Sequence, residues 1–344
     1  MKIQENIPLS SITTMRLGGP ADYVIDIESS DEAVEAIEFA EQKNLPVYFL
    51  GTGANSLGLD EGFHGVIIRN HIKGFETISE TSDELVVRVG GGEIWDDFVE
   101  FVVSKGFSGC EAMSKIPGTV GAAPVQNIGA YGQDISNILE SIETFDTLLD
   151  EHVEIPAQDC DFSYRHSIFN SGETNGRYFI LTCTFRFRKE KLTPPFYNSL
   201  QAYLDEHNIT DYSPRNIRNA VSEIRANKLP DPAVIASAGS FFKNFILTDA
   251  EADAAEKKGI PVYRSATENK VNTGWLLENA GLKGKTFHGF KVSDKAALIL
   301  INESAKTYAD LEKAEAEIAK IVYDKYGFEI KPEPVVIKER ELDD

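Results

Sequence analysis

The amino-acid sequence predicts an α+β protein with two or three domains. Its 344 residues exceed the usual length of a single domain, and 42% of them are apolar, which is enough for a sizeable core. Short segments rich in β-branched and aromatic residues, typical of strands, occur between amphipathic segments typical of helices. We therefore expect helices and strands to be mixed within each domain.

The first 70 residues predict a small β-α-β-β unit. Its strands are expected at 23–27, 47–50 and 65–69. Its helix is expected from residue 31, with Ser30 as the N-cap. The residues before the turn Gly18-Gly19-Pro20 are interpreted as a lead-in without regular structure.

Two further units follow. The second has an amphipathic helix, expected at 94–105, and strands at 85–89, 141–145 and 178–187. A domain boundary is expected near 212–220, where a helix at 217–226 begins. The third unit should contain a strand at 297–301, a long helix capped by Thr307 and ended by Gly327, and strands at 328–330 and 334–337. The charged segment 339–344 is expected to be frayed.

Charge and cysteine content exclude several classes of function. A net charge of −21 repels nucleic acid and anionic membranes, and no apolar run is long enough to cross a bilayer. Three scattered cysteines form no disulfide framework, and the N-terminus lacks the apolar core of a signal peptide. The six histidines show no metal-ligand spacing. We therefore expect a cytoplasmic protein that binds no nucleic acid, membrane or metal.

The segment 116–132 is the first candidate for holding a phosphate group. It combines small residues with two prolines. No Asp or Glu occurs from Met113 to Gln133, where about three would be expected at the average acidic content of the chain. Glycines let such a backbone approach a ligand closely, so its N–H groups can point at phosphate oxygens. A packing turn of small residues is an equally weighted alternative.

A second glycine-rich segment, 51–58, directly follows the predicted strand 47–50. This position suits a phosphate cradle. However, Ser56 stands where the GxGxxG pattern needs its third glycine, and the GKS/T ending of a P-loop is missing. Arg16, beside the Gly-Gly-Pro turn, could contact an anion, although an ordinary surface arginine is the simpler explanation.

Five motifs together make the sequence resemble a known family. In chain order they are Arg16-Leu17-Gly18-Gly19-Pro20-Ala21, the loop 51–55, the segment 116–132, Tyr164-Arg165-His166-Ser167, and Gly239-Ser240-Phe241-Phe242-Lys243-Asn244. This combination closely resembles the UDP-N-acetylenolpyruvoylglucosamine reductases, from about residue 10 to residue 337. The segment Pro194-Pro195-Phe196-Tyr197 is similar to that of the class with a tyrosine loop over the substrate.

The resemblance implies an FAD-binding fold of the vanillyl-alcohol-oxidase type. Two α+β subdomains, expected at 1–70 and 71–212, would bind FAD non-covalently. A C-terminal α/β domain, expected at 213–326, would bind the substrate, and the segment 327–344 would return to the first subdomain. The implied reaction passes a hydride from NADPH through FAD to the methylene of UDP-N-acetyl-enolpyruvoylglucosamine. The product, UDP-N-acetylmuramate, serves bacterial peptidoglycan synthesis, and the enzyme is expected to be a monomer.

The resemblance also assigns three catalytic residues. Ser240 matches the proton donor, Arg165 the residue that stabilises developing negative charge, and Glu333 an acid at the substrate carboxylate. Such groups are needed because hydride addition leaves a carbanion-like carbon that must be protonated. A bare carboxylate would repel this charge, so we expect Glu333 to be protonated or paired. On the residues alone, three alternatives remain open: Ser240 as a helix N-cap, Arg165 in a structural ion pair, and Glu333 as a solvated edge residue.

Other positions match ligand contacts of the family. The implied FAD contacts are Gly51, Thr52, Gly53, Ala54, Asn55, Ser56, Pro117, Gly118, Thr119, Gly121, Ala122, Ala123, Asn127 and Gly129. The implied substrate contacts are Tyr131, Tyr164, Tyr197, Arg225, Lys228 and Asn244. Three positions depart from the family pattern: Ala54 replaces a common serine, Phe245 a usual proline, and Lys295 a neutral polar residue.

Two other functions remain open from the sequence. An FAD oxidase of the same fold would often tether its flavin through His or Cys near the first glycine-rich loop, and 51–58 contains neither. A protein that binds the nucleotide sugar without FAD would be colourless, so the visible spectrum separates it from a flavoenzyme.

Overall fold

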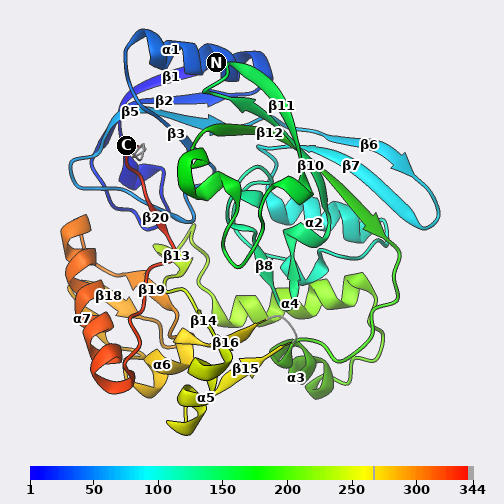
Figure 1. The fold of residues 1–344 in the computed structure, drawn as a ribbon, viewed down its shortest axis with the longest axis vertical. Coiled ribbons are helices and arrows are strands. Elements are labelled where there is room, and N and C mark those ends of the chain that lie inside the picture. The colour runs from blue at the N-terminus through cyan, green and yellow to red at the C-terminus, as the bar shows by residue number, and fades with distance from the viewer. Residues whose placement is uncertain (266–267, 340–344) are drawn as a thin grey trace.

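The N-terminal sheet is the first element of the fold, in a computed structural model that describes residues 1–265 and 268–339 (Figure 1). Its strands lie in the order β1 (Lys2–Pro8), β2 (Pro20–Ile27), β5 (Phe63–Asn70) and β3 (Val47–Leu50). β2 and β3 both pair in parallel with β5, and β1 is antiparallel to β2. Helix α1 (Ser30–Gln42) buries its alanine-rich face on this sheet. The three predicted strands and the helix are confirmed.

Two details of this unit differ from the expectation. The N-cap of α1 is Ser29, whose Oγ accepts a hydrogen bond from the Glu32 N–H at 3.2 Å, so the prediction of Ser30 was wrong. Strand β1 replaces the expected irregular lead-in. It is a mostly exposed edge strand with interspersed polar residues, so its sequence lacks the apolar pattern of a buried strand.

The second sheet is antiparallel throughout. Its order is β11 (Glu151–Pro156), β10 (Leu139–Asp146), β12 (Tyr178–Arg188), β7 (Glu84–Gly90) and β6 (Phe75–Glu80). Helix α2 (Trp95–Ser104) packs against it and buries Trp95, Phe98, Val99 and Val102 completely, as its spacing predicted. The predicted strands are confirmed, while β6 and β11 are additional strands whose residues are mostly exposed.

A buried ion pair at the end of β10 gives a prediction about stability. The Asp146 side chain is 1% exposed, and Arg177 donates to its two oxygens at 2.8 and 2.6 Å. Burial would raise the pKa of Asp146, but these hydrogen bonds outweigh it and hold the pKa below its ordinary value of 3.8. Replacing Arg177 by Met should lower the unfolding free energy by about 3 kcal/mol near neutral pH, because a buried charge loses its partner.

The pH dependence of this effect has a definite sign. Because the folded-state pKa of Asp146 is depressed, the pair stabilises above the unfolded pKa, and this contribution is lost as the pH falls through the folded value. Urea unfolding of the parent and of Arg177→Met should therefore differ less as the pH is lowered from neutrality to below about 3. An equal difference at both ends would contradict this role.

The C-terminal part of the chain contains two smaller sheets. One has the order β13 (Ser237–Ser240), β19 (Ile299–Asn302), β18 (Phe290–Val292) and β17 (Thr286–Phe287). The other has the order β14 (Phe245–Leu247), β16 (Asn269–Val271) and β15 (Val262–Arg264). Helices α5 (Asp249–Lys257), α6 (Thr273–Asn279) and α7 (Tyr308–Tyr326) accompany them. The Thr307 cap of α7 and the left-handed Gly327 at its end are both confirmed.

Two segments connect the N-terminal sheet, the antiparallel second sheet and the two C-terminal sheets. Helix α4 (Pro214–Lys228), at the predicted domain boundary, packs on α2 and on α3 (Asn198–Glu206). Near the C-terminus, the chain with β20 (Val335–Val336) returns toward the N-terminal sheet (Figure 1). There β20 pairs in parallel with β4 (Ser56–Leu57).

One of the strands predicted near the C-terminus does not form. The expected strand at 328–330 is wrong: Phe328 packs on Phe245 instead, with ring centroids 4.7 Å apart, and no ladder forms. Of the charged segment 339–344, residues 340–344 lie outside the described residues. Over the part of the chain that the structure describes, no helix has both the length and the apolar content needed to cross a membrane.

Candidate active site

The two glycine-rich loops predicted from the sequence lie against each other. A Cβ added at Gly51 would lie 3.2 Å from both the Thr119 Oγ1 and the Ala122 Cβ. Gly53 has φ +69°, and a Cβ there would lie 2.1 Å from the Ile12 carbonyl oxygen. The loop 51–58 is therefore held between the segment 116–123 and the N-terminal segment around Ile12, and glycine is required at position 53.

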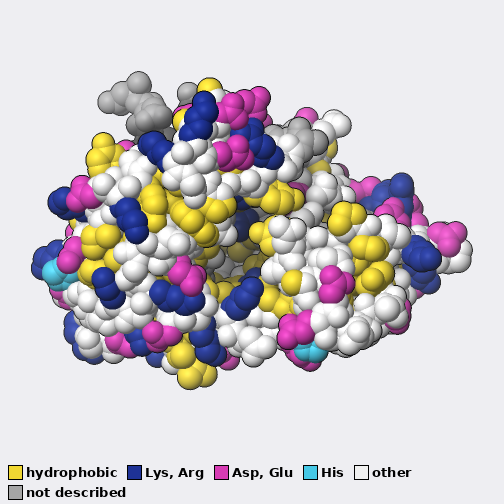
Figure 2. Space-filling model, turned by 90° about the horizontal axis from the view of Figure 1, so that it is seen from below, with side chains coloured by type: hydrophobic (Ala, Val, Ile, Leu, Met, Phe, Trp, Pro, Cys, Tyr) yellow, Lys and Arg dark blue, Asp and Glu magenta, His cyan; other side chains and the backbone are white. Residues whose placement is uncertain are grey.

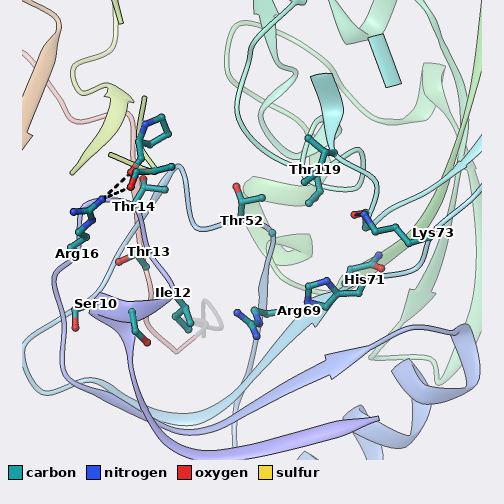
Figure 3. Close-up of a pocket in the computed structure, with 17 residues that line it drawn as sticks. Ser10, Ile12, Thr13, Thr14, Arg16, Thr52, Arg69, His71, Lys73 and Thr119 are labelled. Atoms are coloured by element: carbon teal, nitrogen blue, oxygen red, sulfur yellow. Dashed lines mark hydrogen bonds between the residues drawn. The ribbon is translucent and has the colours of Figure 1, made fainter. Parts of the chain in front are cut away.

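A cavity of about 550 Å³ opens beside these loops (Figure 3). Its glycine-rich wall includes Gly51, Thr52 and Thr119. Its other walls include the basic side chains of Arg16, Arg69 and Lys73, together with His71. This volume is typical of small-molecule sites. A concentration of basic groups in a chain of net charge −21 suits a ligand that carries phosphates.

The basic side chains of this cavity are held by neighbouring groups. Arg69 donates to both carboxylate oxygens of Asp26, at 2.6 and 2.9 Å. Lys73 donates from Nζ to the Gly92 carbonyl at 2.6 Å. Arg16 donates to two carbonyl oxygens of the segment 232–233, at 3.3 and 2.8 Å, which joins the N-terminal segment to the third part of the chain (Figure 3).

Sequence reasoning missed two walls of this cavity. One is the segment 10–14, and the other contains Arg69, Asn70, His71 and Lys73. The second could have been found, because β3 and β5 are adjacent parallel strands and their carboxyl ends meet at one edge of the sheet. Ligands of open parallel sheets bind at such edges. A polar and basic run directly after the predicted strand 65–69 was therefore a usable signal.

The structure places the implied FAD contacts in three ways. Gly51, Thr52 and Thr119 line the cavity. Asn127 instead holds the backbone, since its side chain bonds the Ser163 carbonyl at 3.1 Å and the Ser136 N–H at 3.2 Å. The others belong to the same two loops but do not line this cavity: Gly53, Ala54, Asn55, Ser56, Pro117, Gly118, Gly121, Ala122, Ala123 and Gly129.

The three candidate catalytic residues come from distant parts of the chain and converge. Arg165 donates from Nε to the Glu333 Oε1 at 2.8 Å, and the two side chains are only 21% and 11% exposed. The Glu333 N–H in turn donates to the Phe241 carbonyl at 2.7 Å, one residue after Ser240. The Glu333 carbonyl also accepts a hydrogen bond from the Gln126 side chain of the loop 116–132, at 3.4 Å.

Ser240 and Glu333 are thus held as neighbours by backbone pairing. Ser240 ends β13, where its partner across the sheet is Ile299. Among the described residues, the Ser240 hydroxyl has no hydrogen-bond partner, so it is available to a ligand. Glu333, which was expected to be protonated or paired, forms an ion pair with Arg165.

Four of the implied substrate contacts form two groups, and the first of these groups adjoins Arg165. In the first, Asn244 donates from Nδ2 to the Tyr164 hydroxyl at 3.2 Å, and the Arg165 guanidinium lies 5.4 Å from the Tyr164 ring centroid. In the second, the rings of Tyr131 and Tyr197 meet edge to face, with centroids 5.8 Å apart. Seen from below the view of Figure 1, the molecule has a hollow with basic side chains at its edge (Figure 2).

Two basic residues of α4 complete the implied substrate set. Burial lowers the pKa of the Arg225 guanidinium, with repulsion from Arg165 as a smaller contribution, and burial raises the pKa of the neighbouring Tyr131. The Arg225 Nε is buried and has no hydrogen-bond partner among the described residues. Lys228 is exposed at the last residue of α4.

Two family models match this chain and indicate its class of protein. The model of a family described as "FAD binding domain" matches residues 21–151. A second model, "UDP-N-acetylenolpyruvoylglucosamine reductase, C-terminal domain", matches residues 231–337. The chain is therefore an FAD-dependent oxidoreductase, and the predicted α+β fold class is confirmed.

Relatives of full length identify the family. UDP-N-acetylenolpyruvoylglucosamine reductase from Bdellovibrio bacteriovorus is 36% identical, over 97% of this chain and 99% of that protein. The enzyme of the same name from Flavobacterium johnsoniae is 35% identical, over 98% of this chain and 100% of the relative. The crystal structure of the reductase from Thermus caldophilus shares the fold, with a TM-score of 0.64, 22% identity and coverage of 98% and 99%.

The chain belongs to the UDP-N-acetylenolpyruvoylglucosamine reductase family. This confirms the resemblance seen in the sequence motifs. Membership of the class with a tyrosine loop stays a prediction, as do the roles of the individual site residues.

The glycine at position 53 allows a direct test of the proposed cofactor cradle. Gly53→Ala should lower FAD retention at least tenfold, because its Cβ would overlap the Ile12 carbonyl and the residue would sit at φ +69°. Ala54→Ser, at the next position, should retain at least as much FAD as the parent protein. Flavin absorbance per mole of purified protein measures both. Equal flavin content in Gly53→Ala and the parent would contradict the placement.

Proposed function

We propose that this chain is an NADPH-dependent flavoenzyme that reduces UDP-N-acetyl-enolpyruvoylglucosamine to UDP-N-acetylmuramate in peptidoglycan synthesis. Relatives that are named as this reductase align with the chain over nearly their whole length. The observation that supports this chemistry most strongly is the Arg165–Glu333 pair, held by backbone pairing next to Ser240. This arrangement supports the proposal because Arg165 would stabilise the developing charge and the nearby Ser240 would supply a hydroxyl.

FAD fits the cavity described above. The glycines at 51 and 53 let two loops and the N-terminal segment approach closely, and the cavity beside them is polar and bordered by basic groups. Backbone N–H groups of the loop 51–56 would hold the phosphates, whereas those of residues 120–123 already donate to carbonyl oxygens of the chain. Arg69, which is paired with Asp26, and Lys73, which is paired with Glu93, would add hydrogen bonds to the phosphate oxygens. When bound, FAD supplies hydride chemistry between NADPH and the enolpyruvyl methylene.

The chain's own side chains would then complete the reaction on the substrate. Negative charge develops at the carbon that bears the carboxylate, and the Arg165 guanidinium stabilises it electrostatically. Glu333 orients Arg165 and lies beside the substrate carboxylate. Ser240 donates the proton to the carbanion-like carbon, which is basic enough to accept it from a hydroxyl.

The substrate contacts proposed from the family fit their surroundings. Tyr164 and Asn244, next to Arg165, would hold the part of the substrate near the reacting group. Arg225 and Lys228 would compensate the diphosphate, and Tyr131 with Tyr197 would cover the nucleotide sugar. Tyr197 is 42% exposed, which leaves its ring accessible to a ligand. We also propose that the enzyme is a cytoplasmic monomer that binds neither nucleic acid nor membranes.

The test of this function uses purified protein and defined substrates. The protein should be yellow, and it should consume more than one equivalent of NADPH per flavin only when UDP-N-acetyl-enolpyruvoylglucosamine is present. Mass spectrometry should then show a product heavier by two hydrogens. A colourless protein, or rapid NADPH oxidation with air alone, would contradict the proposal, the second result favouring an oxidase.

A further inference from the structure

A buried ion cluster lies beside the proposed diphosphate contacts, and the chemistry above does not use it. Its centre is the Asp96 carboxylate in the first turn of α2, which is 15% exposed. Arg218 of α4 donates to its two oxygens at 2.7 and 3.1 Å. Burial alone would raise the pKa of Asp96, but hydrogen bonds from Arg218 and Lys115 outweigh it and lower the pKa to about 2. The carboxylate is therefore charged at neutral pH.

The same carboxylate holds a residue in an unusual backbone conformation. Lys115 has φ +61°, in the left-handed region that residues other than glycine seldom adopt. Its backbone N–H donates to the Asp96 Oδ1 at 2.7 Å, and its Nζ donates to the Oδ2 at 2.6 Å. Two hydrogen bonds to one anion thus stabilise the left-handed turn that leads into the loop 116–132.

The carbonyl of that turn fixes Arg225. The Lys115 carbonyl accepts a hydrogen bond from the Arg225 Nη2 at 3.1 Å. Arg218 and Arg225 are seven residues apart on α4, so they lie two turns apart on one face of the helix, and both contact this turn. With one edge of its guanidinium bound to Lys115, Arg225 still has its buried Nε without a partner among the described residues.

We propose that Asp96 is a positioning residue: it holds Lys115 in the left-handed conformation, and the Lys115 carbonyl thereby aims Arg225 at the diphosphate of the sugar nucleotide. The inference rests on the proposed function, which places a diphosphate at Arg225. At position 115, the backbone conformation therefore matters and the exposed ammonium group does not.

Two substitutions at one position separate these contributions. Lys115→Gly and Lys115→Val both remove Nζ and both leave Asp96 and Arg218 in place. Glycine adopts positive φ readily, whereas a β-branched residue resists it. Uridine diphosphate titrated into the flavin-loaded proteins by calorimetry should bind Lys115→Gly within about threefold of the parent affinity, and Lys115→Val about tenfold more weakly. Equal affinities for the two variants would overturn the proposal.

A second pair of variants tests Asp96 itself. Asp96→Ala should weaken uridine diphosphate binding about tenfold, and adding Lys115→Gly should recover most of this loss. Glu100→Gln is the control, because Glu100 accepts hydrogen bonds from Arg218 and Arg215 but not from Lys115. It should bind as the parent does. If Asp96→Ala with Lys115→Gly binds no better than Asp96→Ala, Asp96 only stabilises helix packing and the proposal is wrong.

The outcomes distinguish this inference from the proposed function. Should Asp96→Ala fail to fold, the two Lys115 variants still decide, because they keep the ion cluster. A parent protein that reduces the enolpyruvyl sugar while all variants bind uridine diphosphate equally would overturn only the role of Asp96. A parent that binds no uridine diphosphate would contradict the proposed function and this inference with it.

Discussion

Replacing Ser240 by alanine is expected to lower turnover by about 10²–10⁴-fold, the usual contribution of a positioned proton donor. The loss should be confined to the second half of the reaction. Bleaching of the flavin by NADPH alone should proceed at nearly the parent rate, since no substrate carbon is protonated in that step. Recovery of the flavin colour on adding the enolpyruvyl sugar should be slowed by the full factor. Stopped-flow absorbance measures both steps in one experiment.

A matched control lies on the same strand. Ser237 is buried on β13, and its hydroxyl donates to the Ile235 carbonyl at 3.4 Å, away from the proposed chemistry. Ser237→Ala makes the same chemical change and should leave both half-reactions within about twofold of the parent, as surface or structural hydroxyl losses usually do. Equal slowing of both half-reactions in Ser240→Ala would show that Ser240 is not the proton donor.

The second large effect is expected at the Arg165–Glu333 pair. Arg165→Met should lower kcat by about 10²–10³-fold, because the developing charge loses its principal stabilising group. Arg165→Lys should recover only part of this, since an ammonium cannot reproduce the Nε contact with Glu333. Flavin content and reduction by NADPH serve as controls for cofactor binding.

Glu333→Gln tests whether the two residues act together. If Glu333 works by orienting Arg165, the double variant Arg165→Met with Glu333→Gln should be no slower than Arg165→Met alone, within about threefold. Multiplication of the two single losses would instead show that Glu333 acts on the substrate independently of Arg165. Steady-state kcat values of the four proteins complete this cycle.

The fold was predictable wherever burial left a pattern in the sequence. Strands β5 and β12 and helix α2 carry runs of apolar residues at the spacing of their element, because their inner faces are completely buried. The edge strands β1, β6 and β11 were missed because most of their side chains are exposed, so hydrogen bonding to a neighbouring strand defines them and composition does not.

The site was predictable only in part, for a related reason. The glycine-rich loops are recognisable from their local composition. In contrast, Arg165, Ser240 and Glu333 are far apart in the chain, and only the family resemblance joined them. What brings them together is backbone pairing after residue 330, including the hydrogen bond from the Glu333 N–H to Phe241. The contacts of Asp96 with Lys115 and Arg218 are likewise long-range, and no local pattern marks them.

The most direct test of the central claim is a crystal structure of flavin-loaded Ser240→Ala protein with unreacted UDP-N-acetyl-enolpyruvoylglucosamine. The enolpyruvyl group should lie between the flavin and position 240, with its carboxylate at Arg165. Its carboxylate-bearing carbon should be within about 3.5 Å of the place where the Ser240 hydroxyl lies in the parent protein. A substrate bound with that carbon turned away from position 240, or a flavin outside the cavity beside Gly51 and Thr119, would contradict the proposed mechanism.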